Sequence, residues 1–424
     1  MQIYVVRKGD NLWSIAKRFG TSISAIVQAN QLFDENVLVV GQALIIPTPE
    51  RQIVHIVRPG ESLWSIARQY GTTVETLARD NNITSTSIIL PGQRLIIGKP
   101  IIEVNGYLPQ VGPRGQQVAR NLSAFLTYLS IFSYHILENG DILPIEAQAA
   151  VNIGRSEHAA PLMVITNFSG RKFSSDLAHS VLSNPAAQER LITNVLYVMG
   201  TSGYKGLNID FEYVYPKDRE LYNKFLARVV SRLHPQGFLV STALAPKETA
   251  NQAGLLYEAH DYPVHGRLAD FVVLMTYEWG FATGPPQAIA PINKVRRVLN
   301  YAVTAIPPKK ILMGMPLYGR DWKLPFIKGK SIAKTVSPPD AIRIAAEHKA
   351  DIQYSNISQA PFYHYYDNQG IQHEVWFEDA RSMQAKYNLV REYGLRGVSY
   401  WELMSPFPQN WIVLESNFRV RKII

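Results

Sequence analysis

Three polar side chains alternate with apolar ones in the stretch Gly203–Tyr213, which reads GYKGLNIDFEY. If this stretch forms a strand, Asn208, Asp210 and Glu212 share one face, because side chains two residues apart point the same way. Neighbouring carboxyls split their pKa values, so that a protonated one can stand beside an ionised one near neutral pH. Acid-assisted cleavage of a glycosidic bond needs such a pair, although a polar edge strand or a structural ion-pair network gives the same pattern.

The elements that must position these residues follow a regular alternation. Apolar, strand-like runs are separated by helical segments such as Gln188–Met199, Leu221–Leu233 and Ile292–Val303. The alternation predicts an α/β fold, a parallel (β/α)₈ TIM barrel, over residues 101–424. A doubly wound sheet fits less well, because no glycine-rich phosphate loop follows the first run. The eight runs are Ile101–Tyr107, Tyr128–Ile136, Leu162–Phe168, Gly206–Glu212, Phe238–Ala245, Phe271–Tyr277, Ile311–Leu317 and Gly397–Trp401.

The interval between the seventh and eighth runs is too long for a plain repeat. We predict a small α+β insertion there, at about residues 321–378, standing beside the barrel mouth. Its aromatic residues would line a groove or fill the core of the insertion; they are Phe362, Tyr363, Tyr365, Tyr366 and Trp376. Its predicted elements are a helix at Pro339–His348, a strand at Ile352–Tyr354, and a hairpin of Pro361–Asp367 and Ile371–Phe377 around the turn Asn368–Gly370.

Functional residues of such a barrel collect at the C-terminal ends of its strands. These ends are rich in aromatic and carboxyl side chains, which suits a sugar bound in a cleft. Ser241–Ala245 and Thr166–Ser169 are further strand ends that would touch substrate or simply fill the barrel. After the fourth strand, the candidate side chains are Met275, Tyr277, Glu278, Trp279, Tyr318, Arg320, Tyr400, Trp401 and Glu402.

A duplicated unit precedes the barrel. Val6–Ile46 and Val57–Ile97 align without a gap at an offset of 51 residues, which marks an internal repeat. Each copy is predicted to fold as β-α-α-β, with Trp13 and Trp64 as core anchors. The predicted domains are therefore residues 1–48, 53–98 and 101–424, joined by short linkers at Thr48–Gln52 and Lys99–Pro100.

The composition narrows the classes of partner and site. The net charge of +9 favours an anionic partner, but no Lys/Arg-rich run points to nucleic acid. Cysteine is absent, which excludes disulfides and cysteine-based zinc sites, and the ten histidines show no metal-ligand spacing. We expect no cofactor and no metal. The first residues lack the pattern of a secretory signal, and no apolar run is long enough to span a membrane.

The two repeats resemble LysM modules. The resemblance rests on VRKGDNLWSIAKRFGTSISAIVQAN and VRPGESLWSIARQYGTTVETLARDN, with VGQALIIP and PGQRLIIG. It implies binding of N-acetylglucosamine-containing glycans, such as peptidoglycan or chitin, in a groove between the strand–helix loop and the loop before the last strand. The implied loops are Gly9–Leu12 with Gln28–Leu32, and Gly60–Leu63 with Arg79–Ile83. The implied glycan-binding residues are Gly9, Asp10, Asn11, Leu12, Asn30, Gly60, Glu61, Ser62, Leu63 and Asn81.

Residues 101–424 resemble the family 18 glycoside hydrolases, whose fourth strand carries DGxDxDxE. The stretch here reads KGLNIDFE, and MTYE, MPLYGRDW and VSYWEL match the later strands. The resemblance implies a retaining, substrate-assisted reaction in which Glu212 is the acid and then the base. Asp210 and Tyr277 would orient the 2-acetamido group that attacks the anomeric carbon, over a floor made by Trp401. Asn208, Met275, Trp279, Tyr318 and Arg320 would complete substrate binding.

Two positions depart from the family pattern. Lys205 lies at the start of the strand, away from the chemistry. Asn208 stands where the family has an aspartate that helps to raise the pKa of the acid. Because Asn208 cannot ionise, we expect Asp210 to stay ionised more readily and the pH profile to shift.

The combined modules resemble the family 18 enzymes that degrade spore cortex peptidoglycan during germination, also on the runs MTYEWGFATGPPQAIAPI and PFYHYYDNQGIQHEVWFEDARS. The expected activity is that of a β-N-acetylglucosaminidase acting on peptidoglycan or another N-acetylglucosamine polymer, as a monomer located in the spore. The alternatives are a chitinase-type endo-N-acetylglucosaminidase and a non-catalytic glycan-binding coat protein.

Overall fold

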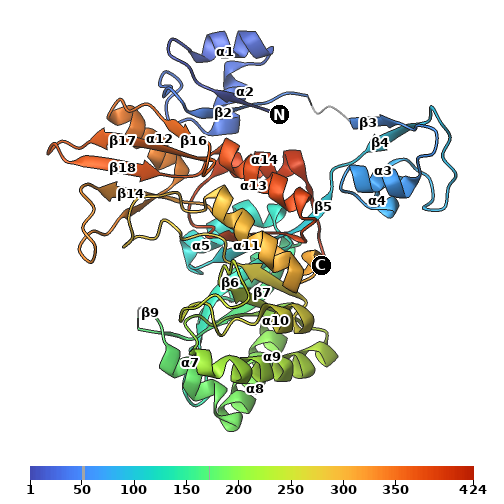
Figure 1. The fold of residues 1–424 in the computed structure, drawn as a ribbon, viewed down its shortest axis with the longest axis vertical. Coiled ribbons are helices and arrows are strands. Elements are labelled where there is room, and N and C mark those ends of the chain that lie inside the picture. Colours follow the sequence, from blue (N-terminus) through green and yellow to red (C-terminus); the bar gives the residue numbers. More distant parts are fainter. Residues whose placement is uncertain (50–52, 171) are drawn as a thin grey trace.

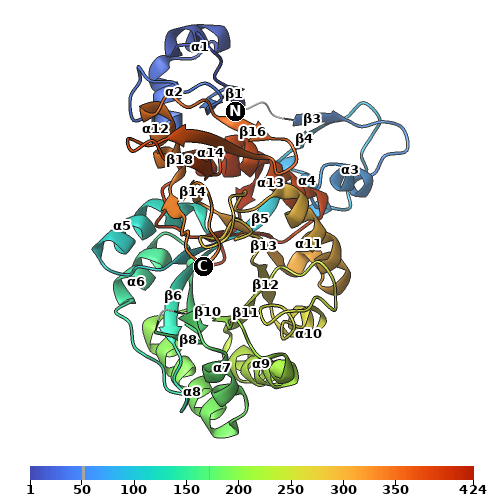
Figure 2. The same ribbon diagram turned by 60° about the vertical axis from the view of Figure 1, so that its left-hand side comes forward.

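The computed structural model describes residues 1–49, 53–170 and 172–424, and its centre is a closed barrel of eight parallel strands (Figures 1 and 2). Each strand pairs with the next along the chain, and β19 pairs with β5 to close the ring. The (β/α)₈ prediction is confirmed. The strands are β5 (Ile101–Leu108), β6 (Tyr128–His135), β7 (Ala160–Thr166), β10 (Gly206–Asp210), β11 (Leu239–Leu244), β12 (Phe271–Leu274), β13 (Ile311–Pro316) and β19 (Gly397–Trp401).

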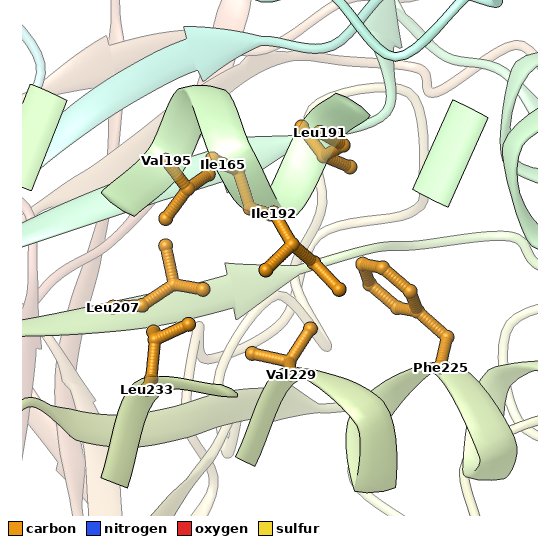
Figure 3. A pocket seen from close by; sticks show the side chains of 8 residues that line it. All are labelled: Ile165, Leu191, Ile192, Val195, Leu207, Phe225, Val229 and Leu233. Carbon is orange, nitrogen blue, oxygen red and sulfur yellow. The ribbon is translucent and has the colours of Figure 1, made fainter. Parts of the chain in front are cut away.

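Helices cover the outside of the barrel, as Figure 2 shows. Behind the strand that carries Asp210, apolar side chains from α8 and α9 pack against β7 and β10 and leave only a narrow apolar space (Figure 3). The helices are α5 (Pro113–Leu122), α6 (Gln148–Ser156), α7 (Ser175–Leu182), α8 (Pro185–Ser202), α9 (Arg219–Leu233), α10 (Tyr262–Leu268), α11 (Ile292–Ala305), α13 (Ala380–Glu392) and α14 (Pro408–Asn417).

The fourth and sixth barrel strands end earlier than predicted. The fourth ends at Asp210, not at Glu212, and the sixth ends at Leu274, not at Tyr277. The chain leaves the sheet at these points, and soon afterwards Tyr213 and Glu278 adopt left-handed backbone conformations with φ of 53° and 64°. An extended sequence pattern does not reveal this, because the last residues of each run keep strand-like composition while they turn into the barrel mouth.

The predicted insertion is present between β13 and β19. It is a five-stranded antiparallel sheet in the order β15-β14-β18-β17-β16, covered by the helix α12 (Pro338–Glu347). The predicted hairpin is β17 (Ala360–Tyr366) with β18 (Gln372–Trp376), and β16 is Gln353–Ser355. Two strands were not predicted, β14 (Gly319–Lys323) and β15 (Lys334–Val336), because their polar composition hides them.

The aromatic residues of the insertion divide between its two faces. Tyr363 and Tyr365 are buried in the apolar cluster beneath α12, so they fill the core of the insertion. Phe362 stacks on Trp376, with ring centroids 4.5 Å apart, and Trp376 packs towards the cluster that contains Tyr318. The core-filling alternative is therefore confirmed for Tyr363 and Tyr365, while Phe362 and Trp376 lie on the opposite face, as the period of two in a strand requires. The groove-lining alternative stays a prediction.

Both repeats fold as predicted, in the order β-α-α-β with antiparallel strands. The first contains β1 (Gln2–Val5), α1 (Leu12–Phe19), α2 (Ile23–Asn30) and β2 (Ala43–Ile46); the second contains β3 (Ile53–Ile56), α3 (Leu63–Gln69), α4 (Val74–Asp80) and β4 (Arg94–Ile97). The expected linker Thr48–Gln52 includes residues 50–52, which lie outside the described residues.

The prediction that Trp13 and Trp64 are core anchors is wrong. Both side chains are 62% exposed. On α1 the buried stripe is Leu12, Ile15 and Ala16, and a residue one position after Leu12 falls off that stripe. The same helical geometry places Trp64 outside the core of the second module.

The first module packs directly on the barrel domain, as Figure 1 shows for α2, α13 and α14. Gln409 of α14 donates hydrogen bonds to the Asn30 Oδ1 atom (2.7 Å) and the Ala43 carbonyl (2.9 Å). The Ile352 N–H donates to the Val40 carbonyl at 2.8 Å. Ile45 is fully buried in the same apolar cluster as the barrel core, so this module is part of a continuous core.

The second module lacks the equivalent packing. Ile96, which aligns with the fully buried Ile45, is 37% exposed, and Leu90, which aligns with the 6% exposed Val39, is 64% exposed. Its ion pair with the barrel domain joins Asp80 to Arg419, with N···O at 2.9 Å. The two repeats are similar in sequence, but among the described residues only the first packs its apolar side chains against the barrel domain.

The structure describes no helix that is long and apolar enough to cross a membrane.

Gly41 and Gly92 provide a matched test of the docked module. They occupy the same turn of the two repeats, with φ of +85° and +87°. An added Cβ would lie 1.8 Å from the Ile352 carbonyl oxygen at Gly41 and would meet nothing within 4 Å at Gly92. In both variants the alanine would adopt a left-handed backbone conformation, which costs about 1–2 kcal/mol. Only the Gly41→Ala side chain would also push the first module away from the barrel domain.

We expect Gly41→Ala to lower the unfolding temperature more than Gly92→Ala, and to increase cleavage by trypsin between the first module and the barrel. Calorimetry and limited proteolysis measure these effects. Equal behaviour of the two variants would show that the first module is not docked in solution.

Candidate active site

Asp210 ends β10 inside the barrel mouth. Its side chain is 4% exposed, and its Oδ1 atom is buried with no hydrogen-bond partner. Burial raises the pKa of Asp210 to about 7. Burial thus raises this pKa even though Asn208 adds no charge beside it. The expectation that Asp210 ionises more readily beside Asn208 than beside an aspartate stays a prediction. A ligand that donates a hydrogen bond to the Asp210 Oδ1 atom would favour the ionised form.

Glu212 lies two residues further on, beyond the end of the strand. Burial raises the pKa of Glu212 well above its usual range, and the nearby charges of Asp210 and Glu278 raise it further. A carboxyl group with a raised pKa keeps its proton at neutral pH and can donate it. The raised pKa of Glu212 is the property that a general acid requires.

Asn208 of β10 is hydrogen-bonded to side chains of β5 and β11. Its Oδ1 atom accepts a hydrogen bond from the Tyr107 hydroxyl at 3.0 Å, and its Nδ2 atom donates to the Ser241 Oγ atom at 2.9 Å. Both polar atoms of the amide are therefore hydrogen-bonded within the protein, and the amide holds Tyr107 beside Asp210. No role is predicted for Tyr107 from the sequence, although it ends the first predicted strand.

Aromatic rings surround the carboxyl groups. Trp401, at the end of β19, makes edge-to-face contacts with Phe132 (ring centroids 4.8 Å apart) and Tyr107 (5.6 Å). Tyr277 packs in the same cluster, and burial raises the pKa of its hydroxyl, so it remains a hydrogen-bond donor. Gly314 makes room for it, because an added Cβ would lie 2.7 Å from the Tyr277 Cε1 atom.

A polar network lies on the insertion side of the mouth. Arg320 donates to the Glu278 Oε1 atom at 2.9 Å, and the Tyr318 hydroxyl donates to the same oxygen. The buried Arg320 Nε atom has no partner. The fold thus brings Arg320 and Tyr318 next to Glu278, a third carboxylate that the sequence placed at a strand end without a role.

Met275 and Trp279, two further candidates in the barrel, pack against apolar side chains. Met275 is buried in the apolar cluster that also includes Tyr277 and Trp401. Trp279 is half-buried against the main core, and its main-chain N–H donates to the Ile289 carbonyl at 3.1 Å. Among the residues that the structure describes, no group of three or more histidine or carboxylate side chains is arranged to hold a metal ion.

Several candidates in the repeats hold the modules together. Asp10 accepts from the Tyr4 hydroxyl (2.6 Å) and the Arg7 N–H (2.8 Å), and Glu61 accepts from His55 (2.7 Å) and the Arg58 N–H (2.7 Å). Both carboxylates close the turn between the first strand and the first helix of their module.

The amide and hydroxyl candidates have similar roles. Asn11 and Ser62 are the N-caps of α1 and α3. Asn30 and Asn81 each bond to the backbone of the second helix and the closing strand, as in the 2.7 Å contact from the Ile45 N–H to the Asn30 Oδ1 atom. Leu12 and Leu63 are buried in the module cores, which leaves Gly9 and Gly60 as open loop positions.

Comparison with known proteins agrees with this arrangement. The family model described as Glycosyl hydrolases family 18 matches residues 106–405, and the LysM domain model matches residues 4–47 and 55–98. The chain therefore belongs to the family 18 glycosyl hydrolases and carries two LysM domains. It is a glycoside hydrolase.

Similar proteins match along their whole length. The chain is 45% identical to the "Cortical fragment-lytic enzyme" of Bacillus subtilis (strain 168), over 100% of this chain and 99% of that protein. The crystal structure of the Bacillus megaterium QM B1551 spore cortex-lytic enzyme SleL superposes with a TM-score of 0.86 at 39% identity, covering 100% and 99% of the two chains. The crystal structure of the Bacillus cereus spore cortex-lytic enzyme SleL superposes with a TM-score of 0.86 at 43% identity, covering 99% of this chain and 98% of that chain.

The variant Asn208→Asp tests the electrostatics of the site. The added negative charge lies near Asp210 and disfavours ionisation of both nearby carboxyl groups, so the pKa of Asp210 rises above about 7 and that of Glu212 rises as well. We expect both limbs of the pH–rate profile to move to higher pH. The profile of kcat/KM measures this shift, and an unchanged profile would contradict it.

Proposed function

We propose that this chain is a retaining β-N-acetylglucosaminidase that degrades spore cortex peptidoglycan by substrate-assisted catalysis. The observation that carries the proposal is the buried, unpartnered Oδ1 atom of Asp210, two residues before Glu212, a carboxyl group whose pKa burial raises. An unsatisfied buried carboxylate oxygen is costly, and an acetamido N–H of the substrate would satisfy it. The full-length similarity to enzymes named for cortical fragments supports the choice of substrate.

In the proposed reaction, Glu212 protonates the leaving glycosidic oxygen. Asp210 accepts a hydrogen bond from the acetamido N–H and so turns the acetamido oxygen towards the anomeric carbon. Tyr277 donates a hydrogen bond to the acetamido group, and Trp401 forms the floor under the sugar ring. The acetamido oxygen bonds to the anomeric carbon as the protonated leaving oxygen departs, which gives a cyclic intermediate. Glu212 then accepts a proton from a water molecule whose oxygen attacks the anomeric carbon and opens the ring. The nucleophile belongs to the substrate, so a single acid with one orienting carboxylate is sufficient.

The arrangement of the modules supports action on a polymer. We propose that residues 1–48 and 53–98 bind glycan while residues 101–424 cleave it as a monomer in the spore. The net charge of +9 favours an anionic cortex. Two binding modules joined to one active site raise the local concentration of a polymeric substrate.

Hydrolysis of purified cortex fragments tests the acid assignment. We expect wild-type protein to release fragments with new reducing N-acetylglucosamine ends, and Glu212→Gln to reduce the rate by about 10²–10⁴-fold without changing the unfolding temperature. Mass spectrometry identifies the ends. Cleavage of chitin but not cortex would instead indicate a chitinase, and binding without cleavage of either polymer would indicate a glycan-binding protein.

The mechanism predicts a strict requirement for the acetamido group. Fragments in which N-acetylglucosamine is replaced by glucosamine should not be cleaved, because the attacking oxygen is missing. Nuclear magnetic resonance should show retained configuration at the anomeric carbon of the natural product. Cleavage of the deacetylated fragments at the natural rate would contradict substrate assistance.

The exposed tryptophans predict part of the glycan-binding surface. Lys17 lies over the ring of Trp13, 4.9 Å from its centroid, and Arg68 lies 5.3 Å from that of Trp64. Each ring is held in place with a positive charge beside it, which suits stacking on a sugar of an anionic polymer.

We expect Trp13→Ala and Trp64→Ala each to weaken binding to insoluble peptidoglycan about 2- to 10-fold, from roughly 0.5–1.5 kcal/mol per ring. The rate on short soluble fragments should be unchanged. Tyr197→Ala, which removes an aromatic ring that is 72% exposed on α8, is the matched control in a pull-down measurement. Weakening by the control to the same degree would contradict a specific role.

A further inference from the structure

The backbone around Glu212 lies outside the barrel sheet. β10 pairs with β7 as far as Asp210 and with β11 only as far as Ile209. No strand partner therefore fixes the peptide groups of Phe211, Glu212 and Tyr213. The Glu212 N–H and the carbonyls of all three residues are nevertheless hydrogen-bonded to side chains from the two neighbouring parts of the barrel.

Asn167 holds Glu212 from one side. This residue directly follows β7, is completely buried, and faces the main chain of Glu212. Its Oδ1 atom accepts from the Glu212 N–H at 3.0 Å, and its Nδ2 atom donates to the Glu212 carbonyl at 2.8 Å. The side-chain amide thus reproduces the pair of hydrogen bonds that a neighbouring strand would give. Its Nδ2 atom also donates to the Ser174 carbonyl at 3.0 Å, which fixes the amide itself.

His260 holds the same segment from the other side. It is completely buried just before α10, and its Nε2 atom lies 2.9 Å from the Phe211 carbonyl oxygen. Its Nδ1 atom accepts from the Ala245 N–H at 2.8 Å, so that nitrogen carries no proton. The proton is therefore on Nε2, which donates to Phe211. Burial lowers the pKa of His260 to about 4, so this neutral tautomer persists across the neutral pH range.

The two side chains act on one peptide group. The carbonyl of the Phe211–Glu212 peptide accepts from His260, and the N–H of the same peptide donates to Asn167. Just beyond it, Tyr213 has a left-handed φ of 53°, and its carbonyl accepts from the Ser175 Oγ atom at 2.5 Å. The direction of the Glu212 side chain therefore depends on contacts from side chains, not on the sheet.

We propose that Asn167 and His260 are positioning residues that fix the main chain of Glu212 so that its carboxyl group reaches the glycosidic oxygen. The inference rests on the proposed role of Glu212 as the acid. Proton transfer requires heavy atoms about 2.6–3.2 Å apart, and a displacement of about 1 Å can cost roughly 100-fold in rate. Neither positioning residue is assigned a contact with the substrate.

Asn417 offers a matched control for Asn167. It is also a buried asparagine, and its Nδ2 atom donates to the Gln384 Oε1 atom and to the Val413 carbonyl, both at 2.8 Å. It lies at the end of α14 and makes no hydrogen bond to the segment that carries Glu212. We expect Asn167→Ala to lower kcat on cortex fragments about 30- to 100-fold with KM changed less than about 3-fold. Asn417→Ala should change kcat less than about 3-fold at a similar loss in unfolding temperature.

A matched pair of variants tests His260. Gln places its amide N–H₂ near the position of the histidine Nε2 atom, whereas Asn places its polar atoms near that of Nδ1. His260→Gln should therefore retain the donor to the Phe211 carbonyl and keep kcat within about 5-fold of wild type. His260→Asn loses that donor and should lower kcat at least about 10-fold more than His260→Gln.

The pH profile gives a readout that a purely structural role would not move. A displaced Glu212 gains water, so its raised pKa falls towards the ordinary value and the basic limb of the kcat/KM profile moves to lower pH. Asn167→Ala and His260→Asn should show this shift, while Asn417→Ala and His260→Gln should not.

Glu212→Gln, measured in parallel, separates the two hypotheses. If Glu212→Gln remains active, the role of Glu212 as the acid is wrong. The second case is that Glu212→Gln is inactive. The positioning role is then wrong if Asn167→Ala has the same kcat as Asn417→Ala and His260→Asn has the same kcat as His260→Gln. If Asn167→Ala does not fold, as judged by circular dichroism, the His260 pair decides the question.

Discussion

The site depends on the burial of two carboxyl groups at the end of one barrel strand. Burial gives Asp210 and Glu212 raised pKa values, and it leaves one oxygen of Asp210 without a partner. Burying carboxyl groups costs free energy unless neighbouring groups compensate, and the surrounding side chains limit this cost. The neighbouring Asn208 is neutral and hydrogen-bonded at both of its polar atoms, and the third carboxylate, Glu278, is paired with Arg320. The unpartnered Asp210 Oδ1 atom is one that a substrate amide can satisfy.

The main-chain position of Glu212, the proposed acid, is set by side chains from both neighbours of β10. The sheet ends at Asp210, and the next peptide is held by Asn167 and His260. This arrangement lets Glu212 turn out of the sheet into the mouth and still have a defined main-chain position. A residue within the sheet would have its direction fixed by the strand, with little freedom to face a glycosidic oxygen above the barrel.

The two LysM modules have similar sequences but pack differently against the barrel domain. The first module contributes Ile45 to the barrel core and bonds to Gln409, whereas Ile96 in the second module remains partly exposed. The first module thus has a fixed direction relative to the active site. The second is joined by the short segment at Lys99 and the pair of Asp80 with Arg419. On a polymer, a fixed and a laterally placed module would hold the chain at two separate points.

The sequence by itself determined the barrel, the insertion and the two repeats, because periodicity and turn signals are local properties of the chain. It also located Asp210 and Glu212 by their spacing. It did not reveal that Trp13 and Trp64 are exposed, although the stripe of Leu12, Ile15 and Ala16 indicates this for α1. Tertiary structure alone decided the strand ends, the pKa values, the docking of one repeat and the roles of Asn167 and His260. These features arise from burial and from contacts between residues far apart in the chain, for which no local pattern exists.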